Sequence, residues 1–138
     1  MKKQSRSEAR QEVFKLIFQT ETNSDDVEFL ISHMLEEKPK SLDNLDYIKT
    51  CVYGVIEKKE ELEEAISENL SKGWKIERIS KVALCVMKLA IFEIKYVDDV
   101  PHKVAINEAV EMEKKYDDPD NSAFVNGVLG GFLKDYLQ

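Results

Sequence analysis

The chain has 138 residues, of which 43% are hydrophobic and 34% charged, and its net charge is −7. This mixture is too apolar for a disordered chain and is typical of one helix-rich domain or of two tightly joined halves. The longest apolar run, residues 82–87, is far too short to span a membrane. The basic N-terminus lacks the apolar segment of a signal peptide, so we expect a cytoplasmic protein that contacts no membrane.

Apolar residues recur at helical spacing along the chain, and five glycines and three prolines leave room for few turns. The first helix is expected over residues 5–20, where Ser5 and Glu8 form a capping-box pattern. A second helix follows residues 23–25 and stops before Pro39.

A third helix begins near Ser41 and has two possible courses. It either continues as far as Leu70 or kinks near Gly54, and Lys72 and Gly73 end it in both cases. A short turn with Trp74, containing a brief helical turn, then leads into the next long helix.

The next helix, expected over residues 80–97, is exceptionally apolar. Between Val82 and Ile94, eleven of thirteen residues are apolar, and only Lys88 and Glu93 interrupt the run. A helix that is apolar on all sides is either central in the core or covered by a bound partner. We favour the central position and keep the covered surface as the alternative.

Two further helices complete the chain, over residues 101–116 and 121–136, with a proline in the first turn of the former. The sequence therefore predicts an all-α fold of about seven helices. We expect one domain with two packed helical halves, residues 1–72 and 73–138.

Nothing in the sequence marks an enzyme. Cys51 and Cys85 lie in apolar stretches without a CxxC spacing, so we expect buried free thiols. His33 and His102 lack the spacing of metal ligands, and the glycines of residues 127–131 follow no strand, as a phosphate loop would. We expect no catalysis, no metal and no cofactor.

Basic side chains gather at the N-terminus. Residues 1–15 hold five basic and two acidic side chains, a balance of +3, which leaves −10 for the rest of the chain. A basic end on an acidic body predicts a local anion-binding site, and a frayed, solvated terminus is the alternative. The five basic residues are Lys2, Lys3, Arg6, Arg10 and Lys15.

Arginines and aromatic residues follow one another along the first helix. Arg6, Arg10, Phe14 and Phe18 are spaced four apart and form one slowly drifting stripe. Guanidinium groups bind phosphates and rings stack on unpaired bases, so the stripe predicts a surface for single-stranded RNA. The alternative is that other elements bury the rings, which we favour for Phe14 and leave open for Phe18.

The last helix carries glycines within its length. Asn126, Gly127, Gly130 and Gly131 lie opposite its apolar face, and Phe124 lies to one side. Each glycine costs about 1 kcal/mol relative to alanine in a helix, so close approach of another backbone or a ligand is the expected compensation. A poorly formed C-terminal helix is the alternative.

Residues 100–111 read VPHKVAINEAVE and residues 124–129 read FVNGVL. These segments strongly resemble the DVPxKVAINEAIE and FVNGVL segments of the NusB family of transcription antitermination factors. Residues 87–94 are similar to its LRLAIYEL helix, and residues 9–19 to its N-terminal helix. The resemblance extends over nearly the whole chain, in order and at the family's spacing.

The resemblance implies about seven helices in two bundles, and binding to boxA, a single-stranded signal in ribosomal RNA leaders. It also implies a heterodimer with NusE, a small-subunit ribosomal protein, and action on RNA polymerase to suppress termination. Some members self-associate, so a homodimer is a further expectation.

Carried onto this chain, the implied RNA-binding residues are Lys2, Lys3, Arg6, Arg10, Phe18, Asn121, Phe124 and Asn126. The implied residues for the protein partner are Glu77, Ser80, Lys81, Leu84 and Lys88.

The sequence departs from the family pattern at Ser7 and Glu8, which interrupt the usual run of arginines, and at Lys88, which replaces an arginine. Fewer phosphate contacts predict weaker RNA binding. One alternative is therefore a helical adaptor that binds only protein. Another is the NusB-like module of ribosomal RNA methyltransferases, which we disfavour because no Rossmann-like region accompanies it.

Overall fold

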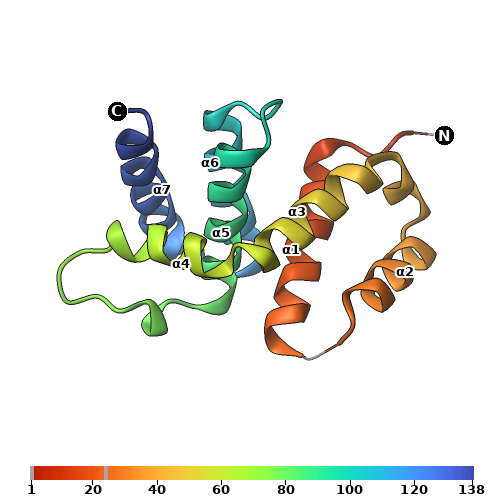
Figure 1. The fold of residues 1–138 in the computed structure, drawn as a ribbon, viewed down its shortest axis with the longest axis horizontal. Coiled ribbons are helices and arrows are strands. Elements are labelled where there is room, and N and C mark those ends of the chain that lie inside the picture. The colour runs from red at the N-terminus through yellow and green to blue at the C-terminus, as the bar shows by residue number, and fades with distance from the viewer. Residues whose placement is uncertain (1, 24) are drawn as a thin grey trace. The chain divides into compact units, whose positions relative to one another are not determined.

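The computed structural model describes residues 2–23 and 25–138, and most of this part of the chain is helical (Figure 1). Seven α-helices and three short 3₁₀-helices form, and no strand occurs among the described residues, which confirms the predicted all-α fold. The chain divides into two compact units, Met1–Ile56 and Glu57–Gln138. The division falls earlier in the chain than the predicted boundary near residue 72, which lies inside the second unit.

The first unit is built from helices that pack through their apolar faces. Side chains of α1 and α2 pack on each other and on the 3₁₀-helix η1, which occupies the place where the sequence predicted the start of the third α-helix. Tyr53 of α3 donates a hydrogen bond to Glu28 of α2. The elements are α1 (Arg6–Thr22), α2 (Val27–Glu37), η1 (Pro39–Asn44) and α3 (Leu45–Glu57).

The third predicted helix does not run on to Leu70. It is interrupted at Lys58, four residues after Gly54, where φ is −101° and ψ is 23°, so the structure is closer to the expected kink near Gly54 than to the continuous course. A new helix, α4 (Lys59–Glu68), then begins and buries Leu62 and Ile66.

The second unit is arranged around α5 (Lys81–Tyr96). This helix packs against α4, α6 and α7, and α6 and α7 lie side by side (Figure 1). The remaining elements are η2 (Ile76–Arg78), α6 (His102–Tyr116), η3 (Pro119–Asn121) and α7 (Ser122–Tyr136).

Helix α5 is central in the core, as predicted. All of its residues from Cys85 to Ile94 are buried, including Lys88 and Glu93, which are both 0% exposed. The Lys88 ammonium lies 3.2 Å from the carboxylate of Glu63. A buried ammonium requires such a partner because leaving water costs an isolated charge several kcal/mol.

Both cysteines are free and buried, which confirms the expectation drawn from their apolar surroundings. Cys51 lies on α3 of the first unit and Cys85 on α5 of the second. Within the described part of the chain, none of the helices has the length and apolarity needed to cross a membrane.

The glycines of α7 differ in what surrounds them. A Cβ atom at Gly131 would lie 2.8 Å from the side-chain oxygen of Asn69, so a close approach compensates this glycine. At Gly127 and Gly130 the same atom would have no described neighbour within 4 Å outside the helix.

We expect Gly127→Ala and Gly130→Ala each to raise the free energy of unfolding by about 0.5–1 kcal/mol, because alanine loses less backbone entropy in a helix. Gly131→Ala should raise the free energy of unfolding by less, or lower it, because the Asn69 side chain must move to make room for the new Cβ atom. Urea unfolding followed by circular dichroism measures all three variants. Equal effects at the three positions would contradict this reading of α7.

Candidate nucleic-acid interface

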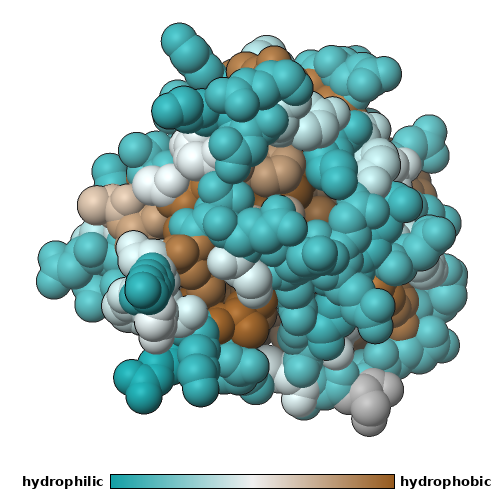
Figure 2. Space-filling model, turned by 60° about the vertical axis from the view of Figure 1, so that its left-hand side comes forward, coloured by the Kyte–Doolittle hydropathy of each residue, from teal (hydrophilic) through white to brown (hydrophobic). Residues whose placement is uncertain are grey.

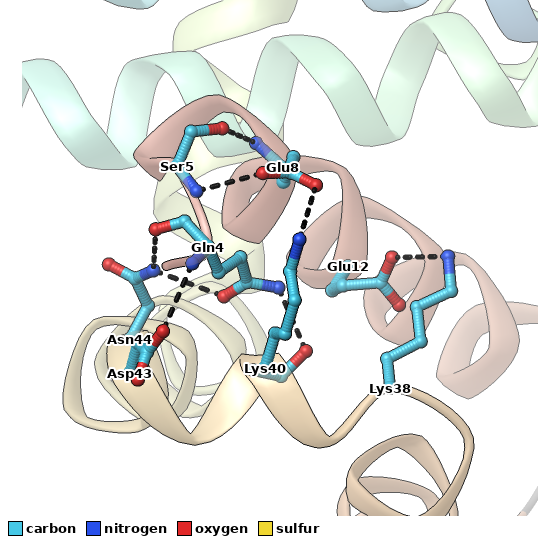
Figure 3. Close-up of polar contacts among 9 residues, drawn as sticks. Gln4, Ser5, Glu8, Glu12, Lys38, Lys40, Asp43 and Asn44 are labelled. Atoms are coloured by element: carbon cyan, nitrogen blue, oxygen red, sulfur yellow. Dashed lines mark hydrogen bonds and ion pairs between the residues drawn. The ribbon is translucent and has the colours of Figure 1, made fainter. Parts of the chain in front are cut away.

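Gln4 holds the N-terminal segment against η1 (Figure 3). Its backbone N–H donates to Asp43 at 3.0 Å, and its side-chain amide donates to Ser41 at 2.9 Å. The Asn44 amide donates in turn to the carbonyl and side-chain oxygens of Gln4, at 3.1 and 3.0 Å. This network ties down the chain just after Lys2 and Lys3, which are both exposed.

Glu8 has a structural role in the arginine-poor start of α1. The Ser5 N–H donates to the Glu8 carboxylate at 2.9 Å and the Glu8 N–H donates to the Ser5 hydroxyl at 3.0 Å, which confirms the predicted capping box. These bonds to Ser5, with the Lys40 ammonium 3.8 Å away, lower the pKa of the Glu8 carboxyl (Figure 3). Its negative charge is therefore partly offset locally.

Both predicted arginines of α1 lie against one ring. The guanidinium carbon of Arg6 is 4.1 Å from the centre of the Tyr47 ring, and that of Arg10 is 5.8 Å from it. Arg6 is exposed and its Nε donates to Asn44 at 3.4 Å, whereas Arg10 is only 2% exposed. The burial of Arg10 counts against a direct phosphate contact by this side chain.

The predicted stripe of arginines and rings does not form one continuous surface. Phe14 is buried, as favoured, and its ring contacts the half-buried Phe18 at a centroid distance of 6.0 Å. Phe18 follows Arg6 by twelve residues, so the two lie about 18 Å apart along the helix axis. Tyr47, the ring beside the arginines, is 8% exposed and offers little surface for stacking. The described ring that lies beside Arg6 and Arg10 is therefore not open to a stacking base.

The second unit brings a ring and cations together in the connection between α4 and α5, drawn in green in Figure 1. Gly73 has φ +90°, as the third residue of a type II turn requires, and the Trp74 N–H donates to the Ser71 carbonyl at 3.0 Å. On the face drawn in Figure 2, polar residues cover most of the surface and hydrophobic ones reach it in patches. Trp74 is one of the exposed large hydrophobic residues, at 53%.

Trp74 lines a cavity of about 250 Å³ together with residues from three other segments. Its ring packs against that of Phe124 on α7, with centroids 5.8 Å apart and planes tilted by 36°. Asn121 contributes at the start of α7, and Arg78 from η2 is exposed. The remaining lining residues are Ile79, Ser80 and Ala83. Two predicted RNA-binding residues, Asn121 and Phe124, therefore share one pocket.

A buried acid lies next to this pocket. Glu113 of α6 is 0% exposed. Burial, followed by the neighbouring Asp117 carboxyl, raises its pKa to about 8. The Ser80 hydroxyl donates to Asp117 at 2.5 Å and accepts from the Ala83 N–H at 3.1 Å, so the acidic cluster is linked to the pocket lining.

Residues 7–134 match the NusB family. The chain belongs to that family.

Relatives and solved structures agree with this assignment. The transcription antitermination protein NusB of Clostridium botulinum (strain Alaska E43 / Type E3) is 40% identical over 132 residues, which span 94% of this chain and 98% of the relative. The structure of T. maritima NusB has 31% identity and a TM-score of 0.82, and the match covers 96% of this chain and 93% of that one. A chain in a structure of the antitermination factors NusB and NusE in complex with dsRNA has 27% identity and a TM-score of 0.83, covering 95% and 97%.

The residues carried over from the NusB resemblance for a protein partner fall into two groups. Glu77, Ser80 and Lys81 are exposed and Leu84 is half-buried, and they follow one another from η2 into α5. Lys88 is fully buried against Glu63, which counts against direct contact with a partner. Asn126, carried over for RNA, is exposed on α7.

Sequence reasoning missed the pocket residues Trp74 and Arg78, although a signal was present. Residues 72–81 hold four basic side chains and one acidic one, a local balance of +3 around the tryptophan. Among the described residues, no group of three or more histidines, cysteines and acids could hold a metal ion.

The raised pKa of Glu113 makes stability depend on pH with a defined sign. Below pH 4.5 the carboxyl is protonated in both states; between 4.5 and about 8 only the unfolded state loses the proton, so stability falls as pH rises. The free energy of unfolding of the wild type should therefore be lower at pH 8.5 than at pH 5. In Glu113→Gln we expect this difference to be smaller by roughly 1–3 kcal/mol. Urea titrations at pH 5 and pH 8.5 measure it.

The matched control is Glu111→Gln, which changes an exposed acid on the same helix. Parallel pH profiles for Glu113→Gln and the wild type would show that Glu113 titrates normally.

Proposed function

We propose that this chain is a transcription antitermination factor that binds single-stranded boxA-type RNA together with NusE. In this role it acts with RNA polymerase on ribosomal RNA operons. The observation that carries the proposal is the likeness, over nearly the full length, to a chain in the structure of the antitermination factors NusB and NusE in complex with dsRNA. The match to the NusB family over residues 7–134 supports the same role.

Local charge supports RNA binding despite the net charge of −7. Lys2, Lys3 and Arg6 are exposed at the start of the first unit, and the network around Gln4 holds this segment in place. Preorganised cations lose less conformational freedom when they bind phosphates. In the second unit, the basic segment of residues 72–78 and the exposed Asn126 add a separate candidate surface.

A helical adaptor that binds only protein is the second candidate. The burial of Arg10 favours it, because one expected phosphate contact is removed from the surface. A gel shift with boxA-type RNA, with and without NusE, separates the two functions. If the chain binds no RNA either with or without NusE, the RNA-binding function is ruled out.

We expect Lys2→Ala, Lys3→Ala and Arg6→Ala each to weaken RNA binding. Each should also lower the slope of log affinity against log salt by up to about 0.7, the value for one phosphate contact on a single strand. Fluorescence anisotropy of labelled RNA at several salt concentrations measures the slope. Lys59→Ala, which removes an exposed cation at the start of α4, is the control. If the salt slopes of the three N-terminal variants match that of Lys59→Ala, the N-terminal residues do not contact RNA phosphates.

We also propose that NusE binds the exposed segment formed by Glu77, Ser80 and Lys81, continuing to Leu84 on α5. Lys81→Glu should weaken NusE binding about tenfold in calorimetry without RNA, because it reverses a charge within the proposed contact. Lys134→Glu makes the same charge change on α7 and should leave NusE affinity unaltered. If both variants bind NusE like the wild type, the partner surface lies elsewhere. Light scattering of the chain alone tests the expected homodimer.

A further inference from the structure

We propose that the pocket beside Trp74 receives one nucleobase of the bound RNA, with Trp74 as the stacking platform and Arg78 as the contact to the adjoining phosphate. This inference rests on the proposed RNA-binding function and adds to it a specific nucleotide site. The residue types suit a nucleotide, because rings stack on bases and guanidinium groups pair with phosphate.

The geometry of the pocket fits one unpaired base. The Trp74 ring contacts Phe124 at a centroid distance of 5.8 Å, so one ring supports the other while 53% of Trp74 remains exposed. The base therefore stacks on the open part of Trp74 and does not insert between the two rings. A cavity of about 250 Å³ is smaller than the 300–1,000 Å³ typical of drug-sized ligands, and it suits a single ring system.

The turn before the pocket holds the platform in place. Gly73 at φ +90° and the hydrogen bond from Trp74 to Ser71 fix the backbone immediately before the ring. An aromatic side chain held in this way has few rotamers to lose on binding. Asn121 lines the same cavity and offers a polar group to the edge of the base.

Charge distinguishes RNA from an apolar protein segment as the occupant. Arg78, an exposed cation, lines the pocket, and Lys72 and Lys75 are exposed in the same segment. Residues 72–78 hold three basic side chains and one acidic one, a balance of +2 on a chain of net charge −7, so cations are concentrated where the exposed ring lies. Stacking rings combined with cations are the recurring arrangement of single-strand binding sites.

Trp74 is the only tryptophan of the chain, so its emission reports on this pocket alone. We expect boxA-type single-stranded RNA to quench that emission with the same midpoint as binding measured by anisotropy of labelled RNA. Trp74→Ala should weaken RNA binding roughly 5- to 100-fold, as loss of one stacked base does, while Trp74→Phe retains most of the affinity. Arg78→Gln should lower the salt slope by about 0.7.

A second measurement separates stacking from a merely structural role. RNAs with one abasic nucleotide, placed at each position in turn, are titrated against the wild type and Trp74→Ala. At one position, the abasic RNA should bind the wild type more weakly than the intact RNA does. The same abasic RNA should bind Trp74→Ala almost as well as intact RNA does, because the missing base and the missing ring remove the same stacking contact. Phe29→Ala, which truncates an exposed ring of α2 in the first unit, is the matched control and should bind RNA normally.

The outcomes distinguish this inference from the function on which it rests. If RNA binds but neither quenches Trp74 nor is weakened by Trp74→Ala, the pocket is not a nucleotide site and the proposed function stands. If Trp74→Ala weakens NusE binding and leaves RNA binding intact, the pocket belongs to the protein partner and the inference is wrong. If no RNA binds with or without NusE, both the inference and the proposed function fail.

Discussion

Burial of α5 on every side is the constraint on which the second unit depends. Its residues from Cys85 to Ile94 are shielded from water, and this requires α4, α6 and α7 to pack around it. The pairing of Lys88 with Glu63 allows an ammonium to remain inside that core. The N-terminus of α5 is fixed by Ser80, which also lines the pocket, so the packing of this helix positions the candidate nucleotide site.

The first unit obtains its exposed cations by a different arrangement. Polar contacts from η1 hold Gln4, and the capping box orders the first turn of α1. Arg6 then lies over the Tyr47 ring, where the ring face attracts the guanidinium while its charge stays at the surface. Hydrophobic packing supports the helices here, but hydrogen bonds determine where the charges lie.

The sequence was sufficient to predict the structure where the contacts join residues close in the chain or where an apolar pattern extends over a whole helix. The Ser5–Glu8 capping box joins residues three apart, and the apolar run of α5 leaves few alternatives to a central helix. The break at Lys58 was expected only as one of two courses and four residues too early, near Gly54, because no residue around Lys58 itself marks a helix end. Arg10 lies at the edge of the apolar face of α1, and tertiary packing decided that it is buried.

The pocket was only partly foreseen for the same physical reason. Phe124 and Asn121 were predicted as binding residues, but their contact with the Trp74 segment joins positions about fifty residues apart, which helical periodicity does not encode. Similarly, Glu113 reads as an ordinary acid in the sequence, and only the packing of α6 removes it from water. Contacts between residues far apart in the chain therefore limit how much of the site can be predicted from the sequence.

The two cysteines have a consequence for following the unfolding of this chain. Cys51 lies in the first unit and Cys85 in the second, and both are 1% exposed or less. A thiol reagent in solution reaches each sulfur only when the surrounding helices open. The rates at which the two thiols react thus provide natural probes of the opening of each unit, without any engineered label.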